Sequence, residues 1–389
     1  MNFNYYIPTK ILFGAGKLGE LHKEVMPGKK ALIVISAGKS TRANGYLAKT
    51  EEQLKLAGVE SVVFDQIQPN PTLVNVRDGA AMAKAQGCDF VIGLGGGSSM
   101  DASKAIAIMA TNPGDYWDYI MAGSGKKMPV PNNPLPIIAI TTTAGTGTEA
   151  DPWMVITKED TKEKIGYGYD KTFPVISVVD PELMTTVPPF LTACQGFDAL
   201  FHSTEGYLNN TAYPISDAFA LKSIELVAKS LAIAVADGEN IEARADVALA
   251  NTMAGMVEST SGCTSEHSIE HAMSAFHTEL THGAGLIMIC KAYYELHASK
   301  GINEERMIDM AKAMGKKDAT SSQDFIDALV ELKEACGVAD LKMSDCGITP
   351  EEFEAIAINA RDTMPGLFAA DSIDVTQEDC IKILSDSYK

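Results

Sequence analysis

Four of the seven histidines in this 389-residue chain lie within the segment SEHSIEHAMSAFHTELTHGAG, at His267, His271, His277 and His282. Neutral imidazole is the commonest protein ligand of transition metals, so this crowding indicates metal chemistry. A second polar pair, Asp198 and His202, lies in GFDALFHSTEGYL. Asp198 and His202 stand four apart, as do His267 and His271, a spacing that places each pair on one face of a helix.

A single pair with this spacing more often marks a solvated helix face than a ligand set. Asp198 and His202, however, stand among Phe197, Leu200 and Phe201, where unpartnered polar groups would be costly. Two such pairs with further histidines nearby therefore favour a metal site. Three imidazoles and one carboxylate suit Fe²⁺, Zn²⁺, Co²⁺, Ni²⁺ or Mn²⁺, and leave room for an alcohol or carbonyl oxygen.

The chain must break between His271 and His282 if both side chains face one ion. Eleven residues of straight helix would separate them by about 16 Å, whereas metal–ligand distances are about 2 Å. The glycines of THGAG supply the break. His277 would point about 80° away from His267 on one helix. We therefore do not expect it to be a primary metal ligand, and we leave open a role as substitute ligand or substrate contact.

Two glycine-rich segments indicate a nucleotide site. In DFVIGLGGGSSMD, Gly95, Gly96 and Gly97 join a strand to a helix, and Ser98 and Asp101 have the spacing of a capping box. Such a turn lets a diphosphate approach the backbone and the helix N-terminus. It could equally be a tight turn without a ligand. The segment TTTAGTGTE (141–149) follows the next strand, and the carboxyl ends of neighbouring strands are where open α/β sheets bind ligands.

The elements that would position these residues fall into two parts. Up to about residue 185, apolar β-rich runs at 30–36, 61–65, 89–94 and 136–142 alternate with helical stretches at 43–57 and 73–86, and PVPNNPLP (129–136) must be a loop. This alternation predicts a parallel, Rossmann-like sheet in a dinucleotide-binding domain, residues 1–185. Residues 186–389 show helical periodicity at 190–208, 214–235, 241–258, 303–314, 322–336 and 350–361, which predicts an all-α domain.

Composition narrows the class of protein. The formal net charge is −19 and 46% of the residues are hydrophobic, which indicates a well-packed globular protein and argues against a nucleic-acid partner. No apolar run approaches the roughly 20 residues of a membrane span, and the N-terminus lacks the features of a signal peptide. We therefore expect no membrane partner and a cytoplasmic location. The seven scattered cysteines indicate reduced thiols rather than disulfides.

Five motifs in order resemble the iron-containing (group III) alcohol dehydrogenases, the family that includes butanol dehydrogenases, 1,3-propanediol dehydrogenases and lactaldehyde reductases. The motifs are GGGSSMD, TTTAGTGTE, VDPELMTTVPP, GFDALFHSTEGY and HSIEHAMSAF…HGAG. The resemblance runs nearly end to end. It implies a dehydroquinate synthase-like architecture, with the metal in a cleft between an α/β nucleotide domain and a helical domain.

Matched motif by motif, the resemblance implies roles for individual residues. The metal ligands fall on Asp198, His202, His267 and His282, and His271 lies beside the reacting centre as the candidate proton relay. Cofactor contacts fall on Gly96, Gly97, Ser98, Asp101, Thr142, Thr143, Thr146 and Lys164. Positions lining the substrate cleft fall on Asn70 and Trp153, and His277 is added as a possible substrate contact.

The choice of dinucleotide depends on the stretch after the first predicted strand. NAD-preferring relatives typically carry an aspartate there for the ribose 2′-hydroxyl, whereas LIVISAGKSTRANGYL has no acidic residue. Ser36 takes the place of the aspartate, and Lys39, Ser40 and Arg42 follow; cations there could attract a 2′-phosphate. The resemblance thus favours NADP(H) with Fe²⁺, and leaves NAD(H) and Zn²⁺ or another divalent metal open.

The expected reaction is reversible hydride transfer between nicotinamide and a small primary alcohol, diol or aldehyde, with the metal polarising the substrate oxygen. A polyol dehydrogenase of the same fold is the alternative. A metallohydrolase would need no glycine-rich nucleotide loop, and a non-catalytic scaffold would need no ligand set. The resemblance also implies a homodimer or larger homo-oligomer.

Overall fold

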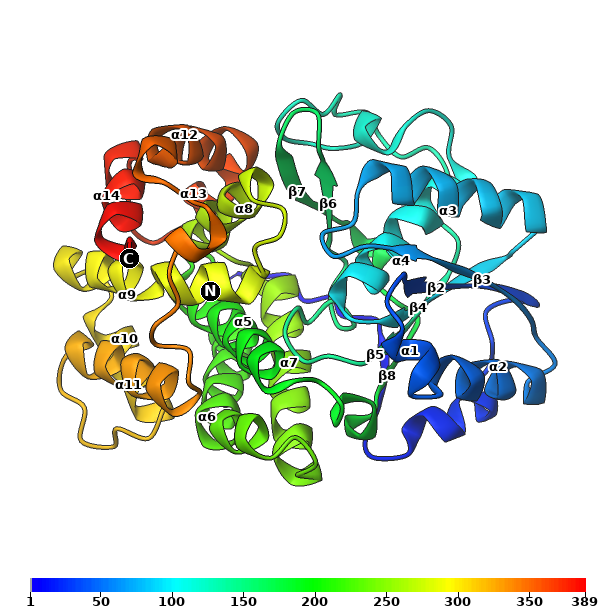
Figure 1. Ribbon diagram of the computed structural model, residues 1–389, viewed down its shortest axis with the longest axis horizontal. Coiled ribbons are helices and arrows are strands. Elements are labelled where there is room, and N and C mark those ends of the chain that lie inside the picture. The colour runs from blue at the N-terminus through cyan, green and yellow to red at the C-terminus, as the bar shows by residue number, and fades with distance from the viewer. Residues whose placement is uncertain (1) are drawn as a thin grey trace.

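A computed structural model describes residues 2–389 as two packed parts, an α/β part and a helical part (Figure 1). The α/β part is built on a six-stranded sheet whose order is β1-β8-β5-β4-β2-β3. All its pairings are parallel. In sheet order, the strands are Lys10–Phe13, Ile176–Val179, Ile137–Thr141, Phe90–Gly95, Lys30–Ser36 and Glu60–Ile67. The predicted parallel α/β architecture is confirmed.

Both faces of this sheet are covered, which explains why its central strands are continuously apolar. On one face, Leu18, Leu21, Leu47 and Leu54 pack against alternate residues of β2 and β4; they come from the 3-10 helix η1 (Lys17–Lys23) and from α2 (Tyr46–Leu56). On the other face lie α3 (Leu73–Gln86) and α4 (Gly97–Thr111). Because β2, β4 and β5 pair in parallel, their carboxyl ends lie at the same edge of the sheet.

Local details of this part differ from the sequence prediction at four places. The sheet strands β1 and β8 were not among the four predicted strands. The helix predicted at 43–57 begins only at Tyr46, as α2, because Gly45 takes a left-handed backbone with φ 75°; a short helix α1 (Ser40–Ala43) precedes it. The helix α4 starts at Gly97 with Gly96 as N-cap, so the predicted Ser98–Asp101 capping box is wrong. An antiparallel hairpin of β6 (Met154–Lys158) and β7 (Glu163–Tyr167) was not predicted at all.

The helical part begins after the sheet. The last sheet strand ends at Val179 and α5 begins at Pro189, so the predicted boundary at 185/186 lies in the connection. The helices are α5 (Pro189–Leu208), α6 (Pro214–Ala236), α7 (Ile241–Thr260), α8 (Ser265–Phe276), α9 (His282–Lys300), α10 (Glu304–Ala313), α11 (Ser322–Ala335), α12 (Phe353–Thr363), α13 (Pro365–Ala370) and α14 (Gln377–Ser387). Between residues 2 and 389, no helix is both long and apolar enough to cross a membrane.

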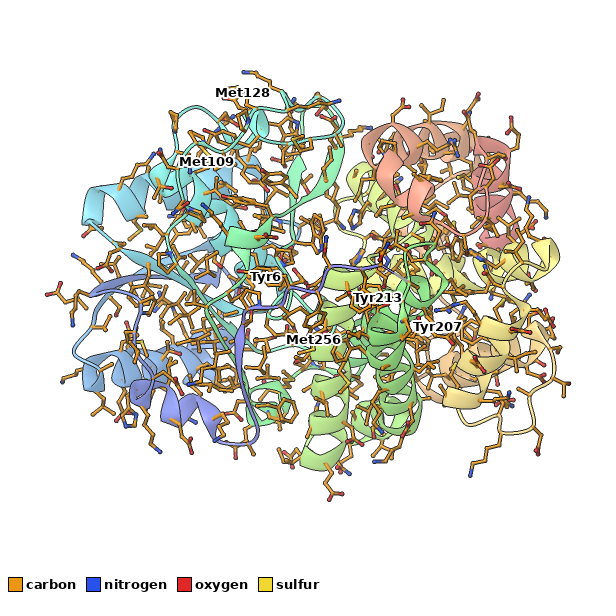
Figure 2. The ribbon with its side chains drawn as sticks, turned by 180° about the vertical axis from the view of Figure 1, so that it is seen from behind. Tyr6, Met109, Met128, Tyr207, Tyr213 and Met256 are labelled. Carbon is orange, nitrogen blue, oxygen red and sulfur yellow. The ribbon has the colours of Figure 1, made fainter. Side chains whose placement is uncertain are left out.

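The two parts are tied together by close backbone contacts and by the N-terminal segment. Gly147, in the loop after β5, approaches Gly255 of α7 so closely that a Cβ added at Gly255 would lie 2.1 Å from the Gly147 carbonyl oxygen. The segment before β1 crosses between the parts (Figure 2): Phe3 stacks on Tyr213 of the helical part, and Tyr6 contacts Phe173 edge-to-face. The contact between Gly147 and Gly255 holds the loop after β5 against α7.

Candidate metal and nucleotide site

The helix α5 carries Asp198 and His202 on one buried face. Proline at its first turn and the apolar residues around the pair favour the helix, and both side chains are almost fully buried. The Nδ1 atom of His202 lies 3.2 Å from the Gly145 carbonyl oxygen. Because a carbonyl only accepts, this contact makes Nδ1 the protonated nitrogen and leaves Nε2 free on the side of Asp198.

The helices α8 and α9 bring two further imidazoles to Asp198. The Oδ1 atom of Asp198 lies 3.7 Å from His202 Nε2, 3.5 Å from His267 Nε2 and 3.4 Å from His282 Nε2. The break predicted between His271 and His282 is confirmed, because α8 ends at Phe276 and α9 begins at His282. The four predicted ligands thus converge from three helices.

These separations fit four groups that share one ion. Two ligands each about 2.1 Å from a tetrahedral metal are about 3.4 Å apart. Within the described chain, Asp198 Oδ1 and His267 Nε2 are buried without a hydrogen-bond partner, an arrangement that is costly unless another ligand satisfies them. Burial lowers the pKa of His202 to about 3, so this ring is in the neutral form that a metal requires.

Two buried glutamates hold the outer nitrogens of two of the predicted ligand rings. Glu205 of α5 accepts a hydrogen bond from His267 Nδ1, and also accepts from the backbone N–H and hydroxyl of Thr264 at the start of α8. Glu270 of α8 accepts from His282 Nδ1. Partners of this kind fix the orientation of a metal-binding imidazole. The sequence prediction missed both residues, although each follows a predicted ligand by three positions, and so lies near that ligand's side of the helix.

A close helix contact sets the position of His282. Gly283, next to it in the first turn of α9, lies against the backbone of α5: a Cβ added there would be 2.1 Å from the Cys194 carbonyl oxygen. A side chain at 283 would push α9 away from α5. The glycine that follows His282 in sequence is therefore required by packing between α5 and α9, two of the three helices that carry the predicted ligands.

We expect Gly283→Ala to destabilise the protein by about 1–3 kcal/mol, the usual cost of forcing extra atoms into a packed contact. We also expect weaker metal binding, because His282 moves with α9. Thermal unfolding and metal content would measure the two effects. Gly366→Ala is the matched control, since a Cβ at Gly366 meets no atom within 4 Å. Unchanged unfolding and metal content in Gly283→Ala would show that the helix contact does not position His282.

The other two histidines of the segment lie outside the group around Asp198. His271 is buried beside His282, with ring centroids 5.3 Å apart, and its Nδ1 is 3.1 Å from the Met364 sulfur. Burial, with the nearby charge of Lys164, holds the pKa of His271 well below its usual range, so the ring is neutral. His277 follows the last residue of α8 and pairs with Glu352 at 3.1 Å. The geometry thus brings His282, rather than His277, to Asp198.

The two glycine-rich loops meet at the carboxyl edge of the sheet. A Cβ at Gly97 would lie 2.5 Å from Thr146 Cγ2, and one at Gly96 would lie 3.1 Å from Thr143 Cγ2. The backbone N–H of Thr142 donates to the Gly95 carbonyl, joining the ends of β4 and β5. No side chain caps α4. The backbone N–H groups of Ser99 and Met100 donate to the Gly96 carbonyl, which leaves those of Gly97 and Ser98 available to an anion. This wall suits a diphosphate.

Comparison with known proteins agrees with this combination of nucleotide loops and buried histidines. The family model described as "Iron-containing alcohol dehydrogenase" matches residues 8–181, and its C-terminal counterpart, "Fe-containing alcohol dehydrogenase family, C-terminal", matches residues 192–388. The chain belongs to the iron-containing alcohol dehydrogenase family. It is a metal-dependent alcohol dehydrogenase that uses a nicotinamide cofactor.

Individual relatives cover nearly the whole chain. The 1,3-propanediol dehydrogenase of Klebsiella pneumoniae is 34% identical over 365 residues, which span 91% of each protein. The NAD-dependent methanol dehydrogenase of Bacillus methanolicus is 34% identical, over 92% of this chain and 93% of its own. The crystal structure of an archaeal halo-thermophilic alcohol dehydrogenase from a Red Sea brine pool superposes with a TM-score of 0.93 at 34% identity, covering 100% of this chain and 99% of the other.

In this iron-containing alcohol dehydrogenase, Asn70, Trp153 and Lys164 lie where the two parts meet. Asn70, with φ 53°, donates from Nδ2 to the Thr278 carbonyl in the break between α8 and α9. Trp153, before β6, donates from Nε1 to the Glu258 carbonyl of α7. Lys164 of β7 donates to the Ser274 hydroxyl and lies 3.5 Å from Glu270. Lys164 therefore contacts a glutamate that orients His282.

The contacts of Asp101 differ from those that the sequence predicted. Its carboxylate does not face the start of α4 but accepts hydrogen bonds from the Thr148 hydroxyl and the Val155 backbone N–H. Burial raises the pKa of Asp101 to about 6. The residue thus ties α4 to the loop after β5 and to the hairpin that the sequence did not reveal.

Ser36, Lys39 and Ser40 stand at or just after the end of β2. Ser36 and Lys39 line a surface pocket of about 420 Å³, together with Ala37, Gly38, Arg42, Ala43 and Asp65. Arg42 pairs with Asp65, a residue of β3, at 2.7 Å. The pocket therefore contains an acid that the sequence around β2 lacks, because β3 runs parallel to β2 and their ends lie at the same edge.

Proposed function

We propose that this enzyme interconverts small primary alcohols or diols with their aldehydes, using one divalent ion held by Asp198, His202, His267 and His282. The observation that carries this is the approach of three imidazole Nε2 atoms to one carboxylate oxygen, at 3.4–3.7 Å. When bound, a divalent ion supplies Lewis acidity toward an oxygen, and nicotinamide supplies or accepts the hydride. Fe²⁺ is the ion we favour, with Zn²⁺ as the alternative.

The protein side chains would orient the reactants and move the proton. The loops at Gly96–Ser98 and Thr142–Thr146 would bind the diphosphate and lead the nicotinamide toward the histidines. His271, buried, neutral and adjacent to His282, would take up the hydroxyl proton in the oxidation direction and return it in reduction. Asn70, Trp153 and His277 remain our candidates for substrate contacts.

Metal analysis and kinetics on one preparation would test this function. Protein purified without oxygen should hold about one divalent ion per chain and oxidise or reduce members of a panel of short alcohols, diols and aldehydes, followed by nicotinamide absorbance. A chelator should abolish turnover, and the ion should restore it. Turnover that persists after complete removal of the metal would overturn the proposed role of the ion.

For the cofactor, we propose a preference for NADP(H), with NAD(H) also used. Lys39 supplies a cation in the pocket after β2, whereas Arg42 is already paired with Asp65. The relatives include an NAD-dependent enzyme, so family membership alone does not choose the cofactor. Discrimination between NADP(H) and NAD(H) in this chain would depend on the balance of the charges of Lys39, Arg42 and Asp65. Homo-oligomer formation and a cytoplasmic location stay predictions from the family resemblance and the composition.

Two substitutions with opposite expected effects on cofactor preference would test the cofactor proposal. Lys39→Asp should lower the NADPH/NADH ratio of kcat/KM about tenfold to a hundredfold, because it removes a charge-assisted bond to the 2′-phosphate. Asp65→Asn should raise the ratio by freeing Arg42. Lys55→Asp, an exposed change at the end of α2 and outside the pocket, is the matched control. A wild-type enzyme at least tenfold better with NADH would contradict the proposal.

A further inference from the structure

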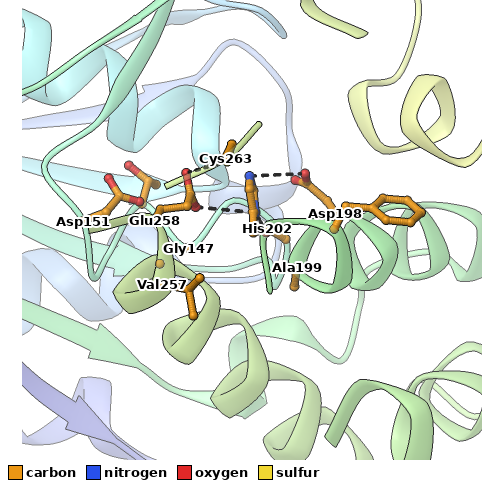
Figure 3. A network of polar contacts seen from close by, with 12 residues as sticks. Gly147, Asp151, Asp198, Ala199, His202, Val257, Glu258 and Cys263 are labelled. Atoms are coloured by element: carbon orange, nitrogen blue, oxygen red, sulfur yellow. Dashed lines mark hydrogen bonds and ion pairs between the residues drawn. The ribbon is translucent and has the colours of Figure 1, made fainter. Parts of the chain in front are cut away.

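The three predicted ligand rings share one feature, which is an oxygen facing the Nδ1 atom of each. Figure 3 shows His202 between Asp198 and Glu258. Its Nε2 atom faces Asp198, and its Nδ1 atom lies 3.2 Å from the Gly145 carbonyl oxygen and 3.5 Å from Glu258 Oε1. Glutamates accept from the same atom in the other two ligand rings. With Nδ1 protonated, each Nε2 atom keeps the lone pair that an ion requires.

His271 lies beside these rings, and its Nδ1 atom faces a sulfur instead of an oxygen. The Sδ atom of Met364 is 3.1 Å away. A thioether sulfur accepts hydrogen bonds and cannot donate one, so this contact makes Nδ1 the protonated nitrogen. Since the His271 ring is neutral, its Nε2 atom then keeps the lone pair. No other hydrogen bond to this ring occurs among residues 2–389.

A bend between two helices brings Met364 to His271 from 93 residues further along the chain. Met364 follows the last residue of α12 and precedes Pro365, the first residue of α13. A residue before proline is kept out of the helical conformation, and Met364 has φ −131° and ψ 56°. Its backbone N–H donates to the Ala360 carbonyl, and its carbonyl accepts from the Leu367 N–H. The bend therefore fixes the point from which the side chain leaves the backbone.

The Met364 side chain also contacts the α/β part. Its methyl carbon lies 3.7 Å from the position that a Cβ at Gly166 of β7 would take. Met364 is partly buried, and His271 is 6% exposed. A methionine side chain is flexible when nothing holds it. Here its sulfur lies against the imidazole and its methyl group lies against β7, so the sulfur is held where it can accept from His271.

We propose that Met364 is a positioning residue: by accepting the Nδ1 hydrogen of His271, its sulfur keeps Nε2 as the nitrogen that exchanges the substrate proton. This inference rests on the proposed role of His271 as proton relay. In oxidation the hydroxyl proton passes to Nε2, the ring becomes a cation, and solvent then removes that proton; reduction reverses these steps. Because a thioether is uncharged, it selects the tautomer without stabilising the cation as a carboxylate would.

Two substitutions of similar size would separate hydrogen bonding from packing. Met364→Leu keeps an apolar side chain but removes the acceptor, whereas Met364→Gln offers an amide oxygen in place of the sulfur. We expect Met364→Leu to lower kcat about threefold to tenfold with KM and metal content unchanged, and Met364→Gln to retain more of the kcat. Packing alone predicts the opposite order. Met314→Leu is the matched control, because Met314 is also a partly buried methionine that follows the last residue of a helix.

The tautomer itself can be measured without turnover, by ¹⁵N NMR of zinc-loaded protein that carries labelled histidine. The ring signals missing from His271→Ala protein identify those of His271. We expect the Nδ1-protonated form in the unmodified protein and in Met364→Gln, and a larger share of the Nε2-protonated form in Met364→Leu. Circular dichroism verifies that each variant is folded.

Two results would overturn the inference while the proposed function stands. One is a His271 ring protonated at Nε2 in the unmodified protein. The other is a Met364→Leu variant with unchanged tautomer or unchanged kcat, when His271→Ala does lower kcat. Normal kcat in His271→Ala would instead overturn the proposed relay, and this inference with it, so the two failures are distinguishable.

Discussion

Replacing His267 with alanine is expected to release the metal and to lower kcat/KM by more than about a hundredfold, because loss of even an outer partner of a ligand commonly costs 10- to 100-fold. The side chain is buried with its Nε2 3.5 Å from Asp198, and Glu205 holds its other nitrogen. Alanine removes one donor and leaves Glu205 buried without that partner. Metal content per chain and steady-state kinetics would measure both effects.

His271→Ala is the matched comparison, since His271 lies one turn further along the same helix and is also buried. It should keep most of the metal while lowering kcat by about 10²–10⁴, the range typical of a general acid–base group. If His271→Ala loses the metal as completely as His267→Ala, the two roles have been assigned wrongly. Equal metal content in both variants would contradict the role of His267 as a ligand.

Glu205→Gln is expected to weaken metal affinity by about 10- to 100-fold while leaving every predicted ligand in place. A carboxylate raises the basicity of the imidazole that donates to it, and an amide does this less. Competition with a chelator of known affinity would give the change. Glu270→Gln should have an effect in the same direction through His282.

Glu149→Gln is the control for the effect of removing a buried glutamate. Glu149 is fully buried and accepts hydrogen bonds from Asn251 and Thr252, not from one of the predicted metal-binding histidines. Its substitution should leave metal affinity nearly unchanged. If Glu205→Gln binds metal as tightly as the unmodified protein, the glutamate acts only as the N-terminal cap of α8, through Thr264.

The sequence predicted much of the fold because the relevant signals are local. Buried parallel strands are continuously apolar, so β2, β4 and β5 could be found from single segments. The break before His282 followed from helix rise and from the glycines nearby. By contrast, β6 and β7 are short strands whose pairing with each other was not evident from either segment.

The residues of the candidate site also divide into those that the sequence could predict and those that it could not. Asp198, His202, His267 and His282 could be proposed because their type, spacing and family resemblance point to metal binding. Asp65 could not be connected with Arg42, because they lie on different elements and meet only where the ends of β2 and β3 align. The carboxylate of Asp101 was predicted to cap its own helix but instead accepts from Thr148 and Val155.

By itself, the sequence determined which residues could do chemistry and which segments had to be helix or strand, since side-chain type and apolar periodicity are properties of the local chain. The tertiary structure decided which donors share one point in space. It placed His282 rather than His277 beside Asp198, and it put Glu205 and Glu270 behind the rings of His267 and His282. The physical reason is that convergence depends on how helices far apart in sequence pack, and close contacts such as Gly283 against Cys194 fix that packing.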